Sequence, residues 1–251
     1  MSDILKSGVD VKKGVIIGIF AAKGGVGKTT FSTNLATLLA KRLPNRVLLI
    51  DANVSVPNIG IHLGILNPPV PIQSVIEGEA EPEEAVIHLN FGLDVIAGRF
   101  SVEGVSRVID WKGILTPLLS KYSVVVMDSS PGLGSETLSV MRTSDLAVVV
   151  STPTAPALAG TLQTIRRLER LNVPIACVVV NMIMGKPYEI PVSEIRRKLK
   201  GFDVFEIEAD HKVPESIAQC RPVVLRYPMS SVSRSFMEIA AKIMKLIQAK
   251  V

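Results

Sequence analysis

Cysteine and aromatic residues are scarce in this chain of 251 residues. The two cysteines, Cys177 and Cys220, stand far apart and fit neither a metal-binding spacing nor a disulfide framework, which indicates a reducing setting. Cys177 lies in an apolar run and is expected to be buried as a small hydrophobic side chain. Aromatic residues make up 4% of the chain and hydrophobic residues 47%, so aliphatic side chains must build the core. This bias is typical of a parallel sheet covered by helices on both faces.

Long hydrophobic runs are also missing. No apolar run approaches the ~18–20 residues of a membrane-spanning helix, and the N-terminus lacks the apolar core of a signal peptide. We therefore expect a cytoplasmic protein, with peripheral contact at the inner face of the membrane as an open alternative. Residues 1–13 are expected to form a short polar arm, and residues 14–251 a single domain. The net charge of +5 slightly favours contact with anionic surfaces, and ordinary solubility explains it equally well.

A glycine-rich segment at residues 23–30 directly follows a hydrophobic run at residues 15–20. Its glycines let backbone N–H groups wrap phosphates without Cβ clashes. Lys28 places a charge against the β- and γ-phosphates, Thr29 offers a hydroxyl to Mg²⁺, and the helix that begins there points its positive end at the anion. The sequence therefore predicts an ATP or ADP site with Mg²⁺, formed by Lys23, Gly24, Gly25, Val26, Gly27, Lys28, Thr29 and Thr30.

This loop departs from the general phosphate-loop pattern at Ala22, where the first glycine is expected. The alternative is a lysine-bearing turn between strand and helix that binds no nucleotide. Consecutive glycines cost conformational entropy that a mere turn does not require, and the flanking strand and helix are the context that the motif needs. Nucleotide binding is therefore the favoured interpretation.

Apolar β-branched runs alternate with helical stretches along the chain. The pattern predicts strands near residues 15–20, 46–51, 93–97, 123–128, 145–151, 174–181 and 203–207. It predicts helices near residues 28–43, 72–77, 111–121, 134–142, 156–171, 192–200, 214–219 and 231–249, with 52–90 otherwise irregular and rich in proline. We expect an α/β fold: a doubly wound, mostly parallel sheet flanked by helices on both faces, as in P-loop NTPases. Ligands of such sheets bind at the carboxyl ends of the strands.

Three strands are followed by polar residues suited to a nucleotide site. Asp51 and Asp128 each follow a buried strand, where a carboxylate would hold a water bound to Mg²⁺. The alternative for each is a helix cap or turn residue, but two carboxylates beside a phosphate loop favour the metal. Asn181 follows the run at residues 178–180, and its amide could pair with a base edge or simply form a turn.

These residues resemble the deviant Walker A ATPases, the family that includes MinD, ParA, Mrp, the nitrogenase iron protein and ArsA. The run Lys-Gly-Gly-Val-Gly-Lys-Thr-Thr carries the resemblance, and Lys23 matches the signature lysine that reaches the partner subunit's phosphates in an ATP-dependent homodimer. Within the family the likeness is to MinD-like proteins and covers about residues 15–247. Residues 51–64 resemble the switch I region, and residues 213–230 the region that packs on the base, which implies base contacts from Val213 and Pro214.

One position departs from the family pattern in switch I. The family usually has Asp-x-Asp, whose second aspartate helps to position the attacking water, and here Asn53 takes that place. An amide can orient water but cannot accept a proton or add negative charge. The resemblance therefore implies an ATPase with catalytic residues Lys23, Lys28, Asp51 and Asn53, sound ATP binding and a low intrinsic rate.

Iron–sulfur chemistry is not expected from this resemblance. Mrp-type carriers normally show a C-x-x-C near the C-terminus, which this chain lacks. The nitrogenase iron protein has a cluster cysteine shortly after the second strand-end aspartate, and residues 128–140 contain none. We therefore expect no iron–sulfur cluster among the partners of this protein.

Three functions are consistent with the sequence. The first is a MinD-like dimerising switch that recruits an unidentified protein to a surface, as in division-site or polar-structure placement. The second is a ParA-like partition ATPase that binds DNA backbone through a basic patch of Arg221, Arg226, Arg234, Lys242 and Lys245. The third is a nucleotide-bound scaffold with little hydrolysis. The apolar stripe of the last helix is expected to pack on its own domain rather than to insert into a membrane.

Overall fold

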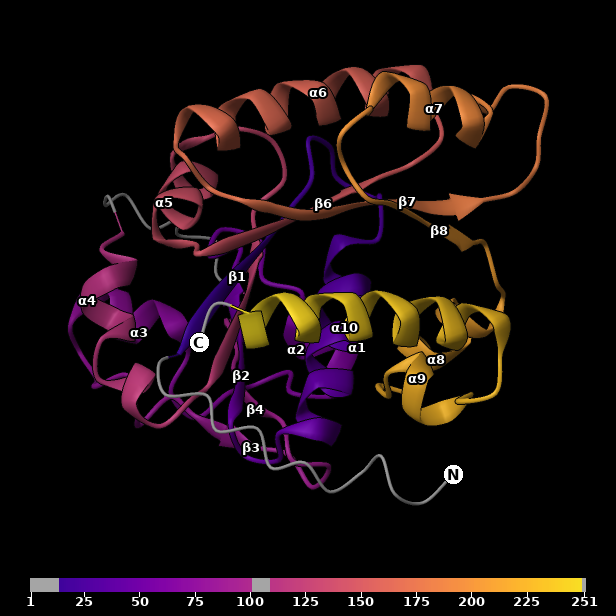
Figure 1. The fold of residues 1–251 in the computed structure, drawn as a ribbon. Helices are drawn as coiled ribbons and strands as arrows, with labels where there is room; N and C mark the ends of the chain where they lie inside the picture. The colour runs from indigo at the N-terminus through magenta and orange to yellow at the C-terminus, as the bar shows by residue number, and fades with distance from the viewer. Residues whose placement is uncertain (1–13, 101–108, 250–251) are drawn as a thin grey trace.

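The computed structural model describes residues 14–100 and 109–249, so the arm expected at residues 1–13 lies outside the described residues. Eight strands form one sheet in the order β3-β4-β2-β5-β1-β6-β7-β8 (Figure 1). All neighbouring strands run parallel except β3 and β4. The strands are β1 (Val15–Phe20), β2 (Val47–Ala52), β3 (Ile87–His88), β4 (Asp94–Ile96), β5 (Val124–Ser129), β6 (Leu146–Ser151), β7 (Ile175–Ile183) and β8 (Val204–Glu208). The expected α/β architecture is confirmed.

Helices cover both faces of the sheet, as the aliphatic composition predicts. One face carries α1 (Lys28–Arg42), α2 (Ile59–Leu63), α8 (Lys212–Ala218), α9 (Val223–Arg226) and α10 (Ser231–Ala249). The other carries α3 (Ile72–Glu77), α4 (Trp111–Leu115), the 3-10 turn η2 (Leu118–Ser120), α5 (Ser135–Thr143), α6 (Ala155–Arg170) and α7 (Val192–Lys198). The central strands β1, β2, β5 and β6 are buried throughout, because each is packed on both faces. Cys177 is fully buried in β7, as expected.

The register of the sheet brings the predicted site residues to one edge. β1 lies between β5 and β6, and β5 also pairs with β2, so that Asp51 and Asp128 are register partners on neighbouring strands. The loop after β1 opens at this same edge, since parallel strands end on the same side of a sheet. The phosphate loop and both carboxylates therefore meet at the carboxyl edge.

Some elements differ from the sequence prediction. The helix expected at residues 111–121 ends at Leu115 and resumes as a 3-10 turn after Pro117, which lacks the N–H that a continuous helix needs. The hairpin strand β3 and the short helices α2 and α9 were not predicted. Elements of two to five residues carry too little periodicity to be detected, and the start of α2 is capped by the carboxylate of Asp51, as described below.

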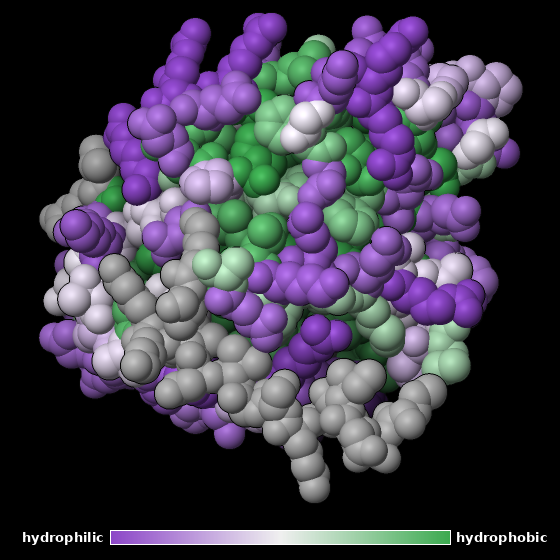
Figure 2. Space-filling view, viewed as in Figure 1, coloured by the Kyte–Doolittle hydropathy of each residue, from purple (hydrophilic) through white to green (hydrophobic). Residues whose placement is uncertain are grey.

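Helix α10 packs its apolar stripe inward, as expected. Val232, Phe236, Ile243 and Ile247 are buried, and Phe236 lies 5.8 Å from the ring of Phe31 on α1. In the view of Figure 2, hydrophobic side chains are visible between the α6–α7 layer and α10, with hydrophilic side chains around them. Within the described ranges no helix is long and apolar enough to cross a bilayer.

The basic patch expected around α10 is partly neutralised. Lys242 Nζ lies 2.6 Å from the carboxylate of Asp203. One of the five basic residues of the patch therefore already has an acidic partner. The guanidinium of Arg226 lies over the ring of Tyr227, 5.5 Å from its centroid. Arg226 keeps its charge in this contact, so only the Lys242–Asp203 pair weakens the argument for an extended DNA-binding surface.

Candidate nucleotide site

The phosphate loop has the left-handed backbone that its glycines predict. Gly25 and Gly27 have φ values of 79° and 84°, which side-chain-bearing residues rarely adopt. A Cβ on Gly27 would lie 2.3 Å from the side-chain nitrogen of Asn181, so the glycine also permits a close approach. The Nδ2 of Asn181 donates to the carbonyl of Val26 over 2.8 Å. Asn181 thus braces the loop with its nitrogen and leaves its oxygen for another partner.

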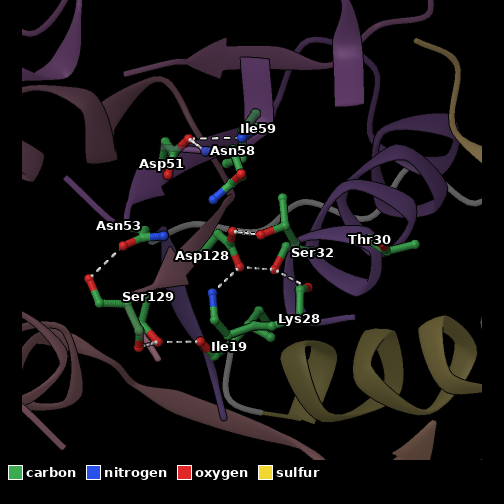
Figure 3. A network of polar contacts seen from close by, with 12 residues as sticks. Ile19, Lys28, Thr30, Ser32, Asp51, Asn53, Asn58, Ile59, Asp128 and Ser129 are labelled. Atoms are coloured by element: carbon green, nitrogen blue, oxygen red, sulfur yellow. Dashed lines mark hydrogen bonds and ion pairs between the residues drawn. The ribbon is translucent and has the colours of Figure 1, made fainter. Parts of the chain in front are cut away.

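A buried cluster of polar side chains centres on Asp128 (Figure 3). Lys28 Nζ lies 2.8 Å from Asp128 Oδ1, and the hydroxyl of Ser32 donates to the same oxygen over 2.8 Å. Thr29 Oγ1 donates to Asp128 Oδ2 over 2.6 Å. Asp128 is fully buried and Lys28 only 7% exposed, so solvent screens this ion pair weakly. The lysine and threonine predicted for phosphate and Mg²⁺ therefore lie beside the second strand-end aspartate.

Asp51 has the helix-cap role that the sequence left open for it, and it uses only one of its two oxygens for that role. Its Oδ2 accepts hydrogen bonds from the backbone N–H groups of Asn58 and Ile59, over 2.8 Å and 2.9 Å, at the start of α2. Its Oδ1 is buried without a hydrogen-bond partner among the described residues. Burial, with repulsion from Asp128 as the next contribution, raises the pKa of Asp51 from 3.8 to about 8. One oxygen thus caps a helix and the other lacks the partner that a buried carboxylate needs.

A divalent cation fits this arrangement. The unpartnered Oδ1 of Asp51, the Thr29 hydroxyl and Asp128 supply oxygen atoms of the kind that Mg²⁺ prefers. No group of three or more His, Cys, Asp or Glu side chains suited to a metal occurs in the described part of the chain. A cation here would therefore depend on phosphate and water oxygens as well, as is usual for Mg²⁺ in nucleotide sites.

Two cavities meet at the phosphate loop. One, of about 340 Å³, is lined by loop residues 23–30 without Val26 and by Asn53, Asn58, His62, Pro131 and Met182. The other, of about 330 Å³, is lined by Asn181, Val213, Pro214 and Phe236 among others. Thr30 and Met182 line both, so the two cavities adjoin. The three residues predicted to contact the base, Asn181, Val213 and Pro214, thus come together from β7 and α8.

His62 was missed by the sequence prediction. One ring nitrogen of His62 lies 3.0 Å from the carbonyl of Asn58, and the other lies 3.2 Å from the Thr30 hydroxyl. Burial lowers the pKa of His62, which favours the neutral ring. A lone histidine in an irregular segment offers no pattern from which this position could have been inferred.

The remaining predicted residues lie around the mouth of the phosphate cavity. Lys23 is exposed there. Asn53, labelled in Figure 3, is buried. Its side-chain nitrogen donates to the carbonyl of Val56, and its oxygen lies 3.0 Å from the hydroxyl of Ser130. The amide is therefore held on both sides at the edge of the cavity.

Comparison with known proteins identifies the family of this arrangement. The family model described as "ParA: NUBPL iron-transfer P-loop NTPase" matches residues 11–244. An uncharacterized ATP-binding protein of Methanocaldococcus jannaschii is 30% identical over 231 residues, covering 91% of this chain and 87% of that protein. An iron-sulfur cluster carrier protein of Aquifex aeolicus is 28% identical over 264 residues, covering 94% of this chain and 69% of the relative.

Solved structures agree with this result. The cell division ATPase MinD of Pyrococcus furiosus superposes with a TM-score of 0.82 at 26% identity, covering 93% of this chain and 99% of the other. The septum site-determining protein MinD of Pyrococcus horikoshii, in complex with Mg-ADP, has a TM-score of 0.82 at 24% identity, covering 95% and 100%. At 24% identity, the similarity to the Pyrococcus horikoshii protein shows a shared fold.

The expectation that no iron–sulfur cluster is a partner was wrong. Relatives named iron-sulfur cluster carrier proteins match nearly the whole chain, and the matched family model itself is described by iron transfer. The expectation relied on the missing C-x-x-C spacing, but cysteines outside that spacing, or from two chains together, can also bind a cluster. Among the described residues Cys220 is exposed and Cys177 is buried.

Proposed function

Because this chain belongs to the ParA family of P-loop NTPases, we propose that it binds Mg-ATP at residues 23–30 and works as a slowly hydrolysing, ATP-dependent dimerising switch. Proteins of this family and fold generally hydrolyse nucleotide. In the proposed cycle, the ATP-bound dimer recruits or positions another protein, and hydrolysis returns it to the monomer. The relatives named MinD support this cycle, since they share the fold over nearly the whole chain.

The adjoining cavities are the observation that carries the proposal. The phosphate cavity offers Lys28, loop N–H groups and a helix N-terminus to an anion, and the second cavity offers apolar walls to a flat base. Asn181 lies at the junction with its oxygen free to accept from the exocyclic amine of adenine. Calorimetric titration with ATP, ADP and GTP in Mg²⁺ tests this assignment. Binding of adenine nucleotides is expected, and failure of all three to bind would contradict it.

Each residue has a proposed part in the cycle. Lys28 would exchange its contact with Asp128 for the β- and γ-phosphates, and Thr29, Asp51 and Asp128 would hold the cation and its waters. The bound cation would neutralise charge on the phosphates, and Asn53 would orient the attacking water through its side-chain oxygen. Lys23, exposed at the mouth of the cavity, would reach the phosphates of a second copy.

Asn53 is expected to limit the rate. In Asn53→Asp the phosphate-release rate at saturating ATP should rise several-fold, because a carboxylate orients water more strongly than an amide does. A coupled phosphate-release assay measures the change. An unchanged rate would refute a role for position 53 in orienting water.

A nucleotide-dependent carrier of iron–sulfur clusters is the second candidate. The family description and the carrier relatives favour it, and Cys220 supplies an exposed thiol on the described surface. Anaerobic reconstitution with iron and sulfide, followed by absorption spectroscopy, tests it. A cluster that survives desalting in the wild type and is lost in Cys220→Ser would support this candidate, and no bound cluster would favour the switch alone.

A further inference from the structure

A carboxylate outside the predicted site joins the two loops that flank the phosphate cavity. Glu136 lies in the first turn of α5, and its two oxygens each accept a hydrogen bond from a serine hydroxyl. Ser55 follows β2 and Ser130 follows β5, and these are the strands that carry Asp51 and Asp128. Glu136 thus bridges the segments that follow Asp51 and Asp128.

The bridge leads directly to Asn53. Ser130 lies within hydrogen-bonding distance of both Glu136 Oε2 and Asn53 Oδ1, the latter at 3.0 Å. A hydroxyl has one proton, so Ser130 can donate to only one of these oxygens at a time. An ionised carboxylate is the stronger acceptor, because charge-assisted hydrogen bonds are roughly twice as strong as neutral ones.

Which oxygen receives the Ser130 hydrogen bond decides how well Asn53 can accept a hydrogen bond from water. Its nitrogen donates to the Val56 carbonyl, which keeps its oxygen on the side of Ser130 and the cavity. When Ser130 donates to Asn53, it takes one of the two lone pairs of that oxygen, and a second hydrogen bond from a water is weaker. When Ser130 donates to Glu136, the Asn53 oxygen keeps both lone pairs and is the stronger acceptor for a water in the cavity. The charge on Glu136 favours the second state.

We propose that Glu136 is a positioning residue for hydrolysis, which accepts the Ser130 hydrogen bond and so leaves both lone pairs of the Asn53 oxygen to orient the attacking water. The negative charge that an amide cannot bring to position 53 is thereby supplied from α5, one side chain away. A purely structural role is the alternative, since an acidic side chain in a first helical turn also stabilises the helix. The two roles differ in what Glu136→Gln does to turnover and to binding.

The test rests on the proposed ATP hydrolysis, and it compares the effect of Glu136→Gln in the wild-type protein with its effect in the Asn53→Asp variant. Glu136→Gln keeps the shape but removes the charge, so phosphate release at saturating ATP should fall about tenfold, the rate equivalent of one hydrogen bond. The dissociation constant of a non-hydrolysable ATP analogue should stay unchanged. In the Asn53→Asp background, Glu136→Gln should have no effect, because a carboxylate at position 53 can accept from Ser130 with one oxygen and orient the water with the other. Glu169→Gln, an exposed glutamate on α6, is the matched control and should behave as wild type.

The outcomes separate this inference from the proposed function. No phosphate release by the wild type would overturn the proposed hydrolysis and this inference with it. If the wild type releases phosphate and Glu136→Gln releases it at the same rate, the inference about Glu136 is overturned while the proposed hydrolysis stands. Equal losses in both backgrounds, or a loss of analogue binding, would show a structural role instead, since independent effects add in a double-mutant cycle.

Discussion

Replacing Lys28 with alanine is expected to abolish measurable turnover and to weaken binding of Mg-ATP on the order of 100-fold or more. Loss of one partner from a buried, hydrogen-bonded charge pair typically costs ~2–5 kcal/mol, and Lys28 is the buried cation of the phosphate loop. Calorimetric titration measures the affinity and phosphate release the rate. The matched control is Lys41→Ala, which removes an exposed lysine from the last turn of the same helix.

The same substitution should also destabilise the protein without nucleotide. Asp128 is fully buried and would lose its only cationic partner in the described part of the chain, keeping the hydroxyls of Thr29 and Ser32. Breaking a buried pair in this way typically costs ~3–5 kcal/mol. The urea midpoint should therefore fall in Lys28→Ala and stay unchanged in Lys41→Ala. Wild-type affinity for ATP in Lys28→Ala would contradict the assignment of the loop.

Stability without nucleotide is expected to fall as the pH rises from about 5 to about 8, and Asp51 is the cause. Its pKa is about 8 in the folded protein and 3.8 as the ordinary value, so the folded state holds a proton that the unfolded state has released. The contribution of Asp51 to the free energy of unfolding is complete below its pKa in the unfolded chain. It is lost as the pH rises through its pKa in the folded protein. The slope attributable to Asp51 approaches about 1.4 kcal/mol per pH unit within this window.

Urea unfolding at several pH values in wild type and Asp51→Asn measures this slope. The amide does not titrate, so its variant should lack the contribution. Mg-ADP should flatten the wild-type slope too, because a nearby divalent cation stabilises the ionised carboxylate. Equal slopes in wild type and Asp51→Asn would show that the unpartnered oxygen of Asp51 does not govern the pH dependence.

The phosphate loop was predictable because its information is local. Gly25 and Gly27 need positive φ values, and the strand before them and the helix after them follow from periodicity. Asn181, Val213 and Pro214 are different, since β7 and α8 bring them together and only the family resemblance indicated the last two. The fold followed from alternating apolar runs, whereas short elements such as β3 had no such pattern.

The Glu136 bridge and His62 were not predictable for a physical reason. Both depend on hydrogen bonds between residues far apart in sequence, such as Ser55 with Glu136 and His62 with Thr30. A single glutamate or histidine has no spacing pattern of its own from which such a contact could be predicted. The iron–sulfur expectation failed differently, because the missing C-x-x-C spacing was taken to exclude a whole class of partner.

The solution mass with and without ATP tests the central claim, an ATP-dependent dimerising switch, most directly. Light scattering coupled to gel filtration should give a mass near 27.0 kDa with Mg-ADP and about twice that with Mg²⁺ and a non-hydrolysable ATP analogue. Lys23→Ala should remain monomeric with the analogue while still binding it. A wild-type protein that binds the analogue and stays at the monomer mass would contradict the claim.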